Sequence, residues 1–99
     1  MAAIVHKTSR ADSDIAGAIL WLLDKNPGAA NKFIDDLESL VARLSRFPEI
    51  YPLQRRSAKP EWQNVRMAVM RRFNYLVFYT YENNLVVIRR VIHSARSEP

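Results

Sequence analysis

The segment FNYLVFYTYENNLVVIRRVIHSAR, residues 73–96, has the pattern of two β-strands joined by a tight turn. Aromatic and β-branched residues fill both halves, and residues 82–84 (ENN) supply the turn, because asparagine tolerates a positive φ. The second strand is unusual because Arg89, Arg90 and His93 lie among valines and isoleucines. This hairpin therefore decides the fold and is also the first place to look for function.

The sequence before the hairpin predicts further elements. Apolar residues recur at helical spacing after Ser9, which we expect to cap a first helix, and a stop and restart at Asn26-Pro27-Gly28 begins a second helix. The expected elements are a strand at 3–7, helices ending near residues 25 and 47, and strands at 64–70, 74–81 and 85–93. The order β-α-α-β-β-β predicts an α+β fold, in which an N-terminal helical hairpin packs on one face of a mostly antiparallel sheet and the other face stays open. Residues 1–99 are expected to form a single domain.

Composition excludes several classes of protein. The chain has no cysteine, which removes disulfides, thiol catalysis and Cys-based zinc sites. The longest apolar run, residues 15–23, is too short to cross a bilayer, and the N-terminus lacks the pattern of a signal peptide. His6 and His93 are isolated from other metal-ligating residues, so we expect no metal, no cofactor and no membrane association, and a cytoplasmic location.

Charge is distributed unevenly along the chain. The net charge is +5, but residues 1–50 carry six Lys/Arg against seven Asp/Glu, whereas residues 51–99 carry nine against three. A basic half of this kind faces a nucleic acid, an acidic protein or simply solvent.

Alternation along the two hairpin strands assigns side chains to faces. It places Tyr75, Val77, Tyr79 and Tyr81 on one side of the third strand. In the last strand it places Arg89 with Val91 and His93, and Arg90 on the opposite side with Val86, Ile88 and Ile92. Each face thus receives an arginine, which must lie at an edge, pair with a carboxylate or face the open side of the sheet, because burial of an unpaired guanidinium is costly.

The hairpin also carries a resemblance to a known family. Ile88, Val91, His93 and Arg96 are similar to a pattern at the C-terminal end of the RelE/ParE superfamily of type II toxins, after an aromatic strand and a polar turn. Upstream, a capped helix, an Ala-Xaa-Xaa-Phe segment (residues 30–33), Pro48 and an arginine at the start of a strand, Arg66, resemble the same superfamily. The resemblance spans nearly the whole chain.

The resemblance implies a bacterial toxin that a cognate, ParD-like antitoxin neutralises in a hetero-oligomer. RelE-like members are ribosome-dependent mRNA endonucleases, whereas ParE-like members inhibit DNA gyrase and thereby arrest growth. Only Lys59 supplies a lysine after residue 50, and the first half is net acidic, so the ParE branch is favoured. On that interpretation the protein is not an enzyme, and it binds its target through Arg66, Arg89, Arg90, His93 and Arg96.

Two other functions remain open. An endoribonuclease needs a general base, an acid and cations for the phosphate charge, and His93, Arg66, Arg90 and Tyr79 are the candidates. A non-enzymatic nucleic-acid binder would use only the basic half. The structural alternatives, without catalysis, are a hydrogen-bonding role for His93 and a packed sheet face for Tyr79.

The antitoxin-binding surface is less defined by sequence. We expect it to include Trp62, in the proline-rich connector of residues 48–63, and the apolar faces of residues 11–44.

Overall fold

A computed structural model gives the fold, and it describes residues 2–54 and 64–96. The elements are β1 (Ile4–Lys7), α1 (Ser9–Lys25), α2 (Pro27–Arg46), β2 (Val65–Met70), β3 (Tyr75–Glu82), β4 (Leu85–His93) and a 3₁₀ turn, η2 (Ser94–Arg96). The predicted β-α-α-β-β-β order is confirmed. Of the predicted connector, residues 55–63, with Trp62, lie outside the described residues.

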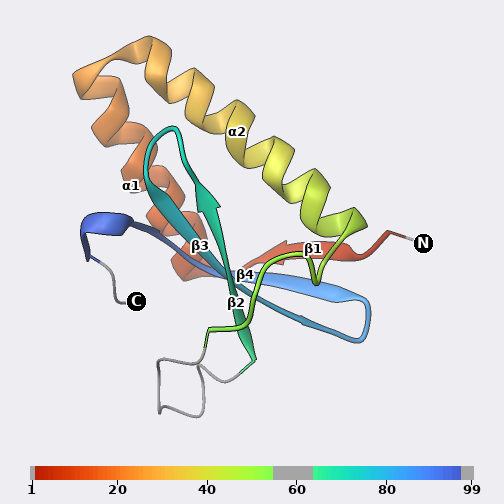
Figure 1. Ribbon diagram of the computed structural model, residues 1–99. Helices are drawn as coiled ribbons and strands as arrows, with labels where there is room; N and C mark the ends of the chain where they lie inside the picture. Colours follow the sequence, from red (N-terminus) through yellow and green to blue (C-terminus); the bar gives the residue numbers. More distant parts are fainter. Residues whose placement is uncertain (1, 55–63, 97–99) are drawn as a thin grey trace.

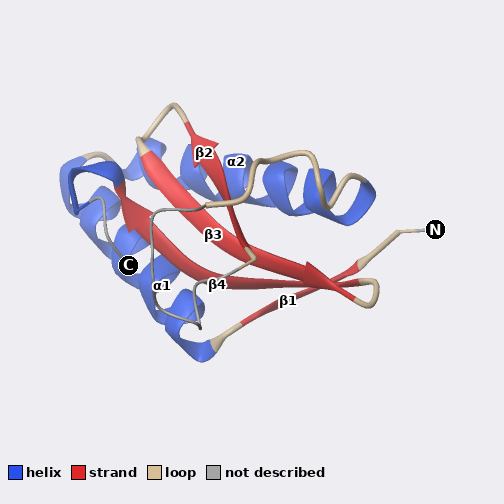
Figure 2. Ribbon diagram, turned by 60° about the horizontal axis from the view of Figure 1, so that its bottom comes forward, coloured by secondary structure: helices blue, strands red, loops and turns tan. Residues whose placement is uncertain are grey.

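The four strands form one mixed sheet in the order β1-β4-β3-β2. β4 is antiparallel to β3, and β3 is antiparallel to β2, whereas β1 runs parallel to β4, with Ile4 opposite Leu85 and Lys7 opposite Ile88. The sheet is therefore not antiparallel throughout. Both helices lie on one side of it (Figures 1 and 2), as predicted.

Short polar residues set the ends of the helices. Thr8, not the predicted Ser9, caps α1, and its hydroxyl accepts a hydrogen bond from the Ala11 N–H at 3.0 Å. Asn26 ends α1 through its own N–H and caps α2 through its side chain, which accepts from the Gly28 N–H. One residue thus closes one helix and opens the next, and this produces the tight helical hairpin.

Asparagines also make the turns of the sheet. Asn83 and Asn84 have φ values of 52° and 63° between β3 and β4, and Asn74 has a φ of 59° before β3. Asparagine adopts this left-handed conformation more readily than other residues with a Cβ, so these turns follow from local sequence.

The main core lies between the helices and the sheet. Its largest fully buried side chains include Phe33 and Leu44 of α2, Tyr79 of β3 and Ile88 of β4. Phe33 packs edge-on against the ring of Tyr75, with the ring centres 5.1 Å apart. Within residues 2–54 and 64–96, no helix is long and apolar enough to cross a membrane.

The opposite face of the sheet is not bare, which corrects the expectation of an open face. Val65, Phe78 and Ile92 are buried there in a second, smaller cluster, and Met67 and Leu76 pack against them. Guanidinium groups therefore do not line this whole face.

A bulge in β4 overturns the strict alternation expected for that strand. Tyr79 pairs with Ile88, but the preceding residue Phe78 pairs with Arg90, so Arg89 is an extra residue between two ladder positions. Val86 and Ile88 before the bulge, and Val91 after it, all lie in the core between sheet and helices. The predicted grouping of Arg90 with Val86 and Ile88, and of Arg89 with Val91, is therefore wrong.

Candidate functional site

The bulge sends the two arginines of β4 into different environments. Arg90 is largely buried and donates from Nε and Nη2 to the two carboxylate oxygens of Asp14 on α1, at 2.8 and 3.2 Å. The same carboxylate accepts the Val91 N–H at 3.0 Å. Arg89 is exposed, and its Nε donates to the Thr80 hydroxyl at 3.3 Å.

The Asp14 contact has a structural reason. β1 pairs with β4 only as far as Ile88, and beyond that point no strand of the described residues lies beside the outer edge of β4. Asp14 satisfies the Val91 N–H on this edge and neutralises the adjacent guanidinium. We call the set Asp14, Arg90 and Val91 the α1–β4 clamp, and sequence reasoning missed its acid because the two charged partners are 76 positions apart.

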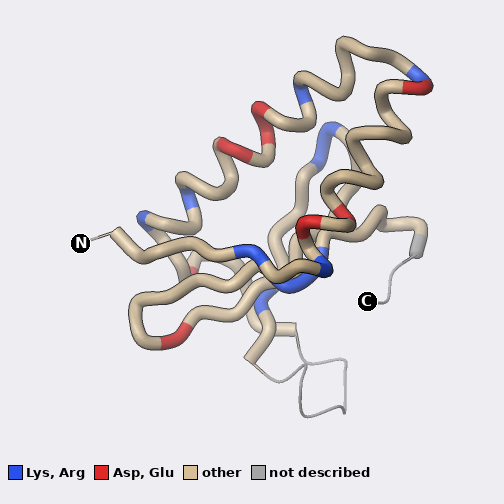
Figure 3. The backbone as a smooth tube through the Cα atoms, turned by 180° about the vertical axis from the view of Figure 1, so that it is seen from behind, with Lys and Arg blue, Asp and Glu red and all other residues tan. Residues whose placement is uncertain are grey.

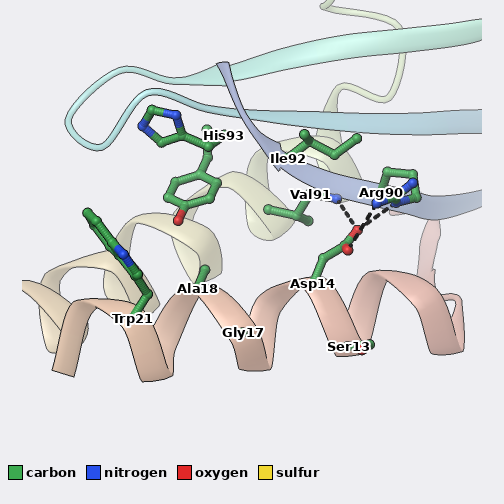
Figure 4. Close-up of a pocket in the computed structure, with 10 residues that line it drawn as sticks. Ser13, Asp14, Gly17, Ala18, Trp21, Arg90, Val91, Ile92 and His93 are labelled. Atoms are coloured by element: carbon green, nitrogen blue, oxygen red, sulfur yellow. Dashed lines mark hydrogen bonds and ion pairs between the residues drawn. The ribbon is translucent and has the colours of Figure 1, made fainter. Parts of the chain in front are cut away.

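Beside the clamp, α1 and the end of β4 enclose a hollow of about 440 Å³ (Figure 4). Ser13 to Trp21 of α1 supply one wall, and residues 90–93 of β4 with the Tyr75 ring supply the other. Figure 4 shows Trp21 at one end of the hollow and the clamp at the other. Gly17 leaves room in this wall, since a Cβ there would meet nothing within 4 Å.

His93 lies at the rim of this hollow, and its ring packs edge-on against Tyr75 at 5.2 Å. Its Nδ1 accepts a hydrogen bond from the Ala95 N–H at 3.1 Å, which ties it to the turn that follows β4. A ring nitrogen that accepts a hydrogen bond carries no proton, so in this arrangement the proton of the neutral ring is on Nε2. His93 thus presents a donor, not a base, to anything that approaches through Nε2.

Arg66 and Tyr79 serve a different part of the molecule. Arg66 Nη1 donates to the backbone oxygens of Tyr51 and Glu49 at 2.7 and 3.2 Å, and its Nη2 lies 3.5 Å from the Glu49 carboxylate. The Tyr79 hydroxyl donates to the Pro48 carbonyl at 2.8 Å, and burial raises the pKa of this phenol. Both side chains fasten the segment after α2 to the sheet.

The predicted site residues therefore do not form one constellation. Arg66 lies opposite Tyr79, whereas His93 lies opposite Tyr75, four residues or about 13 Å along β3. Arg66 lies on the helix-covered face with Ala68, and its cross-strand partner Tyr79 is fully buried. Arg96 belongs to η2, but its side chain lies outside what the structure describes.

Acidic and histidine side chains do not converge on a metal site anywhere in residues 2–54 and 64–96. The described part of the chain also holds exposed apolar side chains on the helical hairpin. Leu20, Trp21 and Leu23 of α1 are 68%, 56% and 46% exposed, while Ala11, Ala18 and Leu22 are buried in the core. Only part of the apolar surface expected between residues 11 and 44 is thus available to a partner.

The arrangement is an α+β fold with a helical hairpin over a four-stranded sheet, and the described candidate residues do not assemble into one acid–base centre. The model of one family, the ParE toxin of the type II toxin–antitoxin system parDE, matches residues 5–98. The chain belongs to this family. No curated protein sequence matches it.

Solved structures with the same fold include three toxin–antitoxin systems. The chromosomal ParDE system of P. aeruginosa is similar with a TM-score of 0.73 and 18% identity, over 92% of this chain and 95% of that one. The RelBE2 complex of Mycobacterium tuberculosis gives 0.64 and 25%, over 94% and 99% of the two chains. The DinJ–YafQ complex of E. coli gives 0.60 and 15%, over 97% of both. The chain is thus a type II toxin by family, and RelE/ParE-like by fold.

Proposed function

We propose that the protein arrests growth in the cytoplasm by binding and inhibiting DNA gyrase, and that a ParD-like antitoxin neutralises it. The observation that carries the choice of target is the separation of the residues required for RNA cleavage. Tyr79 is buried and bonded to Pro48, Arg66 is bonded to the chain at residues 49–51, and His93 lies about 13 Å farther along the sheet.

Cleavage of RNA requires a base, an acid and cations within reach of one phosphodiester. Among the candidates for this chemistry, the guanidiniums of Arg66 and Arg90 are already bonded to carboxylates and carbonyls of the described chain. Inhibition of a protein target requires only a surface, and the chain belongs to the ParE family, the branch whose resemblance implies gyrase inhibition.

A supercoiling assay with purified gyrase tests the proposal. The purified toxin is expected to inhibit supercoiling or to accumulate cleaved DNA at micromolar concentration, and Tyr79→Phe is expected to retain this effect. A toxin that arrests cells but leaves gyrase untouched, and whose induction produces new mRNA ends that disappear with His93→Ala, would instead be an endonuclease.

We also propose that the antitoxin covers the exposed apolar side chains of the helical hairpin. Leu20 and Leu23 lie one turn apart on α1, and Ile34 of α2 is also exposed. Large solvent-exposed aliphatic residues at this spacing suit an amphipathic segment of a partner.

This surface can be tested by co-expressing the toxin with the antitoxin, sought in the neighbouring reading frame, and by co-purifying the two proteins. The double variant Leu20→Glu, Leu23→Glu is expected to lose the antitoxin and keep its thermal stability. A charge control at Asn31 of α2, which is also exposed, Asn31→Glu, is expected to keep the complex. Retention of the antitoxin by the double variant would place the interface elsewhere.

A further inference from the structure

We infer that Arg89, and not Arg90, is the arginine of β4 that contacts the target, and that it binds a carboxylate of a protein. The inference rests on the proposed toxin function and specifies its contact surface. It starts from the bulge, which gives the two adjacent arginines opposite roles.

Arg90 has no freedom to bind a target. Both Nε and Nη2 already donate to Asp14, the two side chains are only 12% and 16% exposed, and the same carboxylate holds the Val91 N–H. Release of Arg90 would leave an unpaired carboxylate and an unpaired backbone N–H on the edge of β4.

Arg89 is in the opposite situation. It is exposed, and among residues 2–54 and 64–96 only its Nε is engaged, by the Thr80 hydroxyl, and it forms no ion pair. The two terminal nitrogens of the guanidinium remain as a fork, the geometry that binds a carboxylate through two parallel hydrogen bonds. Bulges commonly re-aim a side chain in this way beside functional sites.

Two more cations lie at the same corner of the molecule. Thr8 donates from its N–H to Ile88 and from its hydroxyl to the Arg89 carbonyl, which holds the junction of β1 and α1 against the bulge. Lys7 and Arg10 flank this junction, and both are exposed. Figure 3 shows the basic segments gathered where β1 runs into α1 beside β4. We call Lys7, Arg10 and Arg89 the basic corner.

The acids near the basic corner do not cancel it. Asp14 is committed to Arg90, and Asp12, in the first turn of α1, supplies one exposed negative charge beside three positive ones. The basic corner therefore has a net positive charge that can bind an acidic group.

The surface beside the basic corner favours a protein over DNA. Along β4, Leu85 and Val87 share the face of Arg89 before the bulge; on β1, Ile4 lies opposite Leu85 and is 68% exposed, and His6 lies opposite Val87. This mainly apolar stripe ends at Arg89. Arginine beside exposed apolar residues is typical of protein interfaces, whereas a duplex backbone requires cations spread along a longer track.

The test compares Arg89→Gln with Arg71→Gln, a matched loss of one exposed arginine in the turn between β2 and β3. Binding to purified gyrase without DNA is expected to weaken about 10- to 100-fold for Arg89→Gln, the value of one charge-assisted contact, and less than about twofold for Arg71→Gln. Ile4→Ser is expected to weaken binding as well, because it removes the other end of the stripe. All three variants are expected to keep the wild-type unfolding midpoint and the antitoxin.

Several results would overturn the inference. Unchanged binding by Arg89→Gln would do so, and so would an equal loss in the two arginine variants, which would indicate charge alone. Binding of the wild type to duplex DNA alone, lost in Arg89→Gln, would assign the corner to phosphates. If the wild type does not bind gyrase, the proposed target fails, and growth arrest in cells then decides: loss of arrest with Arg89→Gln but not Arg71→Gln supports the inference, and retained arrest refutes it.

Discussion

Removal of the Asp14 carboxylate should be the most damaging single change on the surface of α1. Asp14→Ala leaves the Arg90 guanidinium largely buried without its anion and leaves the Val91 N–H without an acceptor. Hydrogen bonds to charged groups contribute about 1.5–3 kcal/mol, and loss of one partner of a buried ion pair costs about 3–5 kcal/mol. Because both side chains of this pair retain slight exposure, we expect a cost of about 3 kcal/mol.

For a domain of this size, that cost corresponds to a fall in Tm of about 12–24 °C. Urea unfolding followed by circular dichroism gives the free energy, and a double-mutant cycle with Arg90→Ala isolates the pair, with an expected coupling of about 1.5–3 kcal/mol. The matched control is Asp36→Ala, which removes the acid of a more exposed ion pair with Arg72 and is expected to cost less than about 1 kcal/mol.

Two outcomes would refute the reasoning. One is a cost for Asp14→Ala no larger than that for Asp36→Ala, which would mean that the α1–β4 clamp contributes no more than a surface ion pair. The other is that the changes in unfolding free energy caused by Asp14→Ala and Arg90→Ala simply add up in the double variant, because two residues that interact directly should show a coupling energy.

Three smaller changes probe other parts of the fold. Gly17→Ala should stabilise the protein by about 0.5–1 kcal/mol, because the glycine is inside a helix and a Cβ meets open space; a loss in the urea midpoint would contradict this. Thr8→Ala should cost about 1–2 kcal/mol and Ser9→Ala almost nothing, and the reverse order would restore Ser9 as the cap. Tyr79→Phe should cost about 1 kcal/mol at neutral pH through the lost bond to Pro48. Burial raises the pKa of Tyr79 above its ordinary 10.0, so above about pH 10 the unfolded chain releases this proton before the folded protein does. The wild type should therefore lose stability as the pH rises, and the difference in unfolding free energy between wild type and Tyr79→Phe should narrow. A difference that does not change with pH would show an ordinary phenol.

Local signals in the sequence were sufficient for the elements of the fold. The helical hairpin follows from apolar spacing and from Asn26-Pro27, and the β3–β4 turn follows from two adjacent asparagines with positive φ. These features depend on residues a few positions apart, so the chain shows them without its tertiary context.

The candidate site was less accessible from sequence for two physical reasons. A bulge adds one residue to one strand without changing its composition, so alternation assigned Arg89 and Arg90 to the wrong groups. The partner of Arg90 lies on α1, and no local pattern links Asp14 to a residue so distant in the chain. For Tyr79 the sequence offered a structural role beside a catalytic one, and its burial supports the structural role.

The parallel pairing of β1 with β4 joins the earliest strand of the sheet to the latest, and Ile4 and Leu85 are 81 positions apart. During synthesis at about 5–20 residues per second, β1 waits roughly 4–16 seconds for the segment that it pairs with. The helical hairpin, whose contacts are local, does not have to wait. If the antitoxin binds the helical hairpin as proposed above, the order of translation exposes that binding surface before Lys7, Arg10 and Arg89 come together.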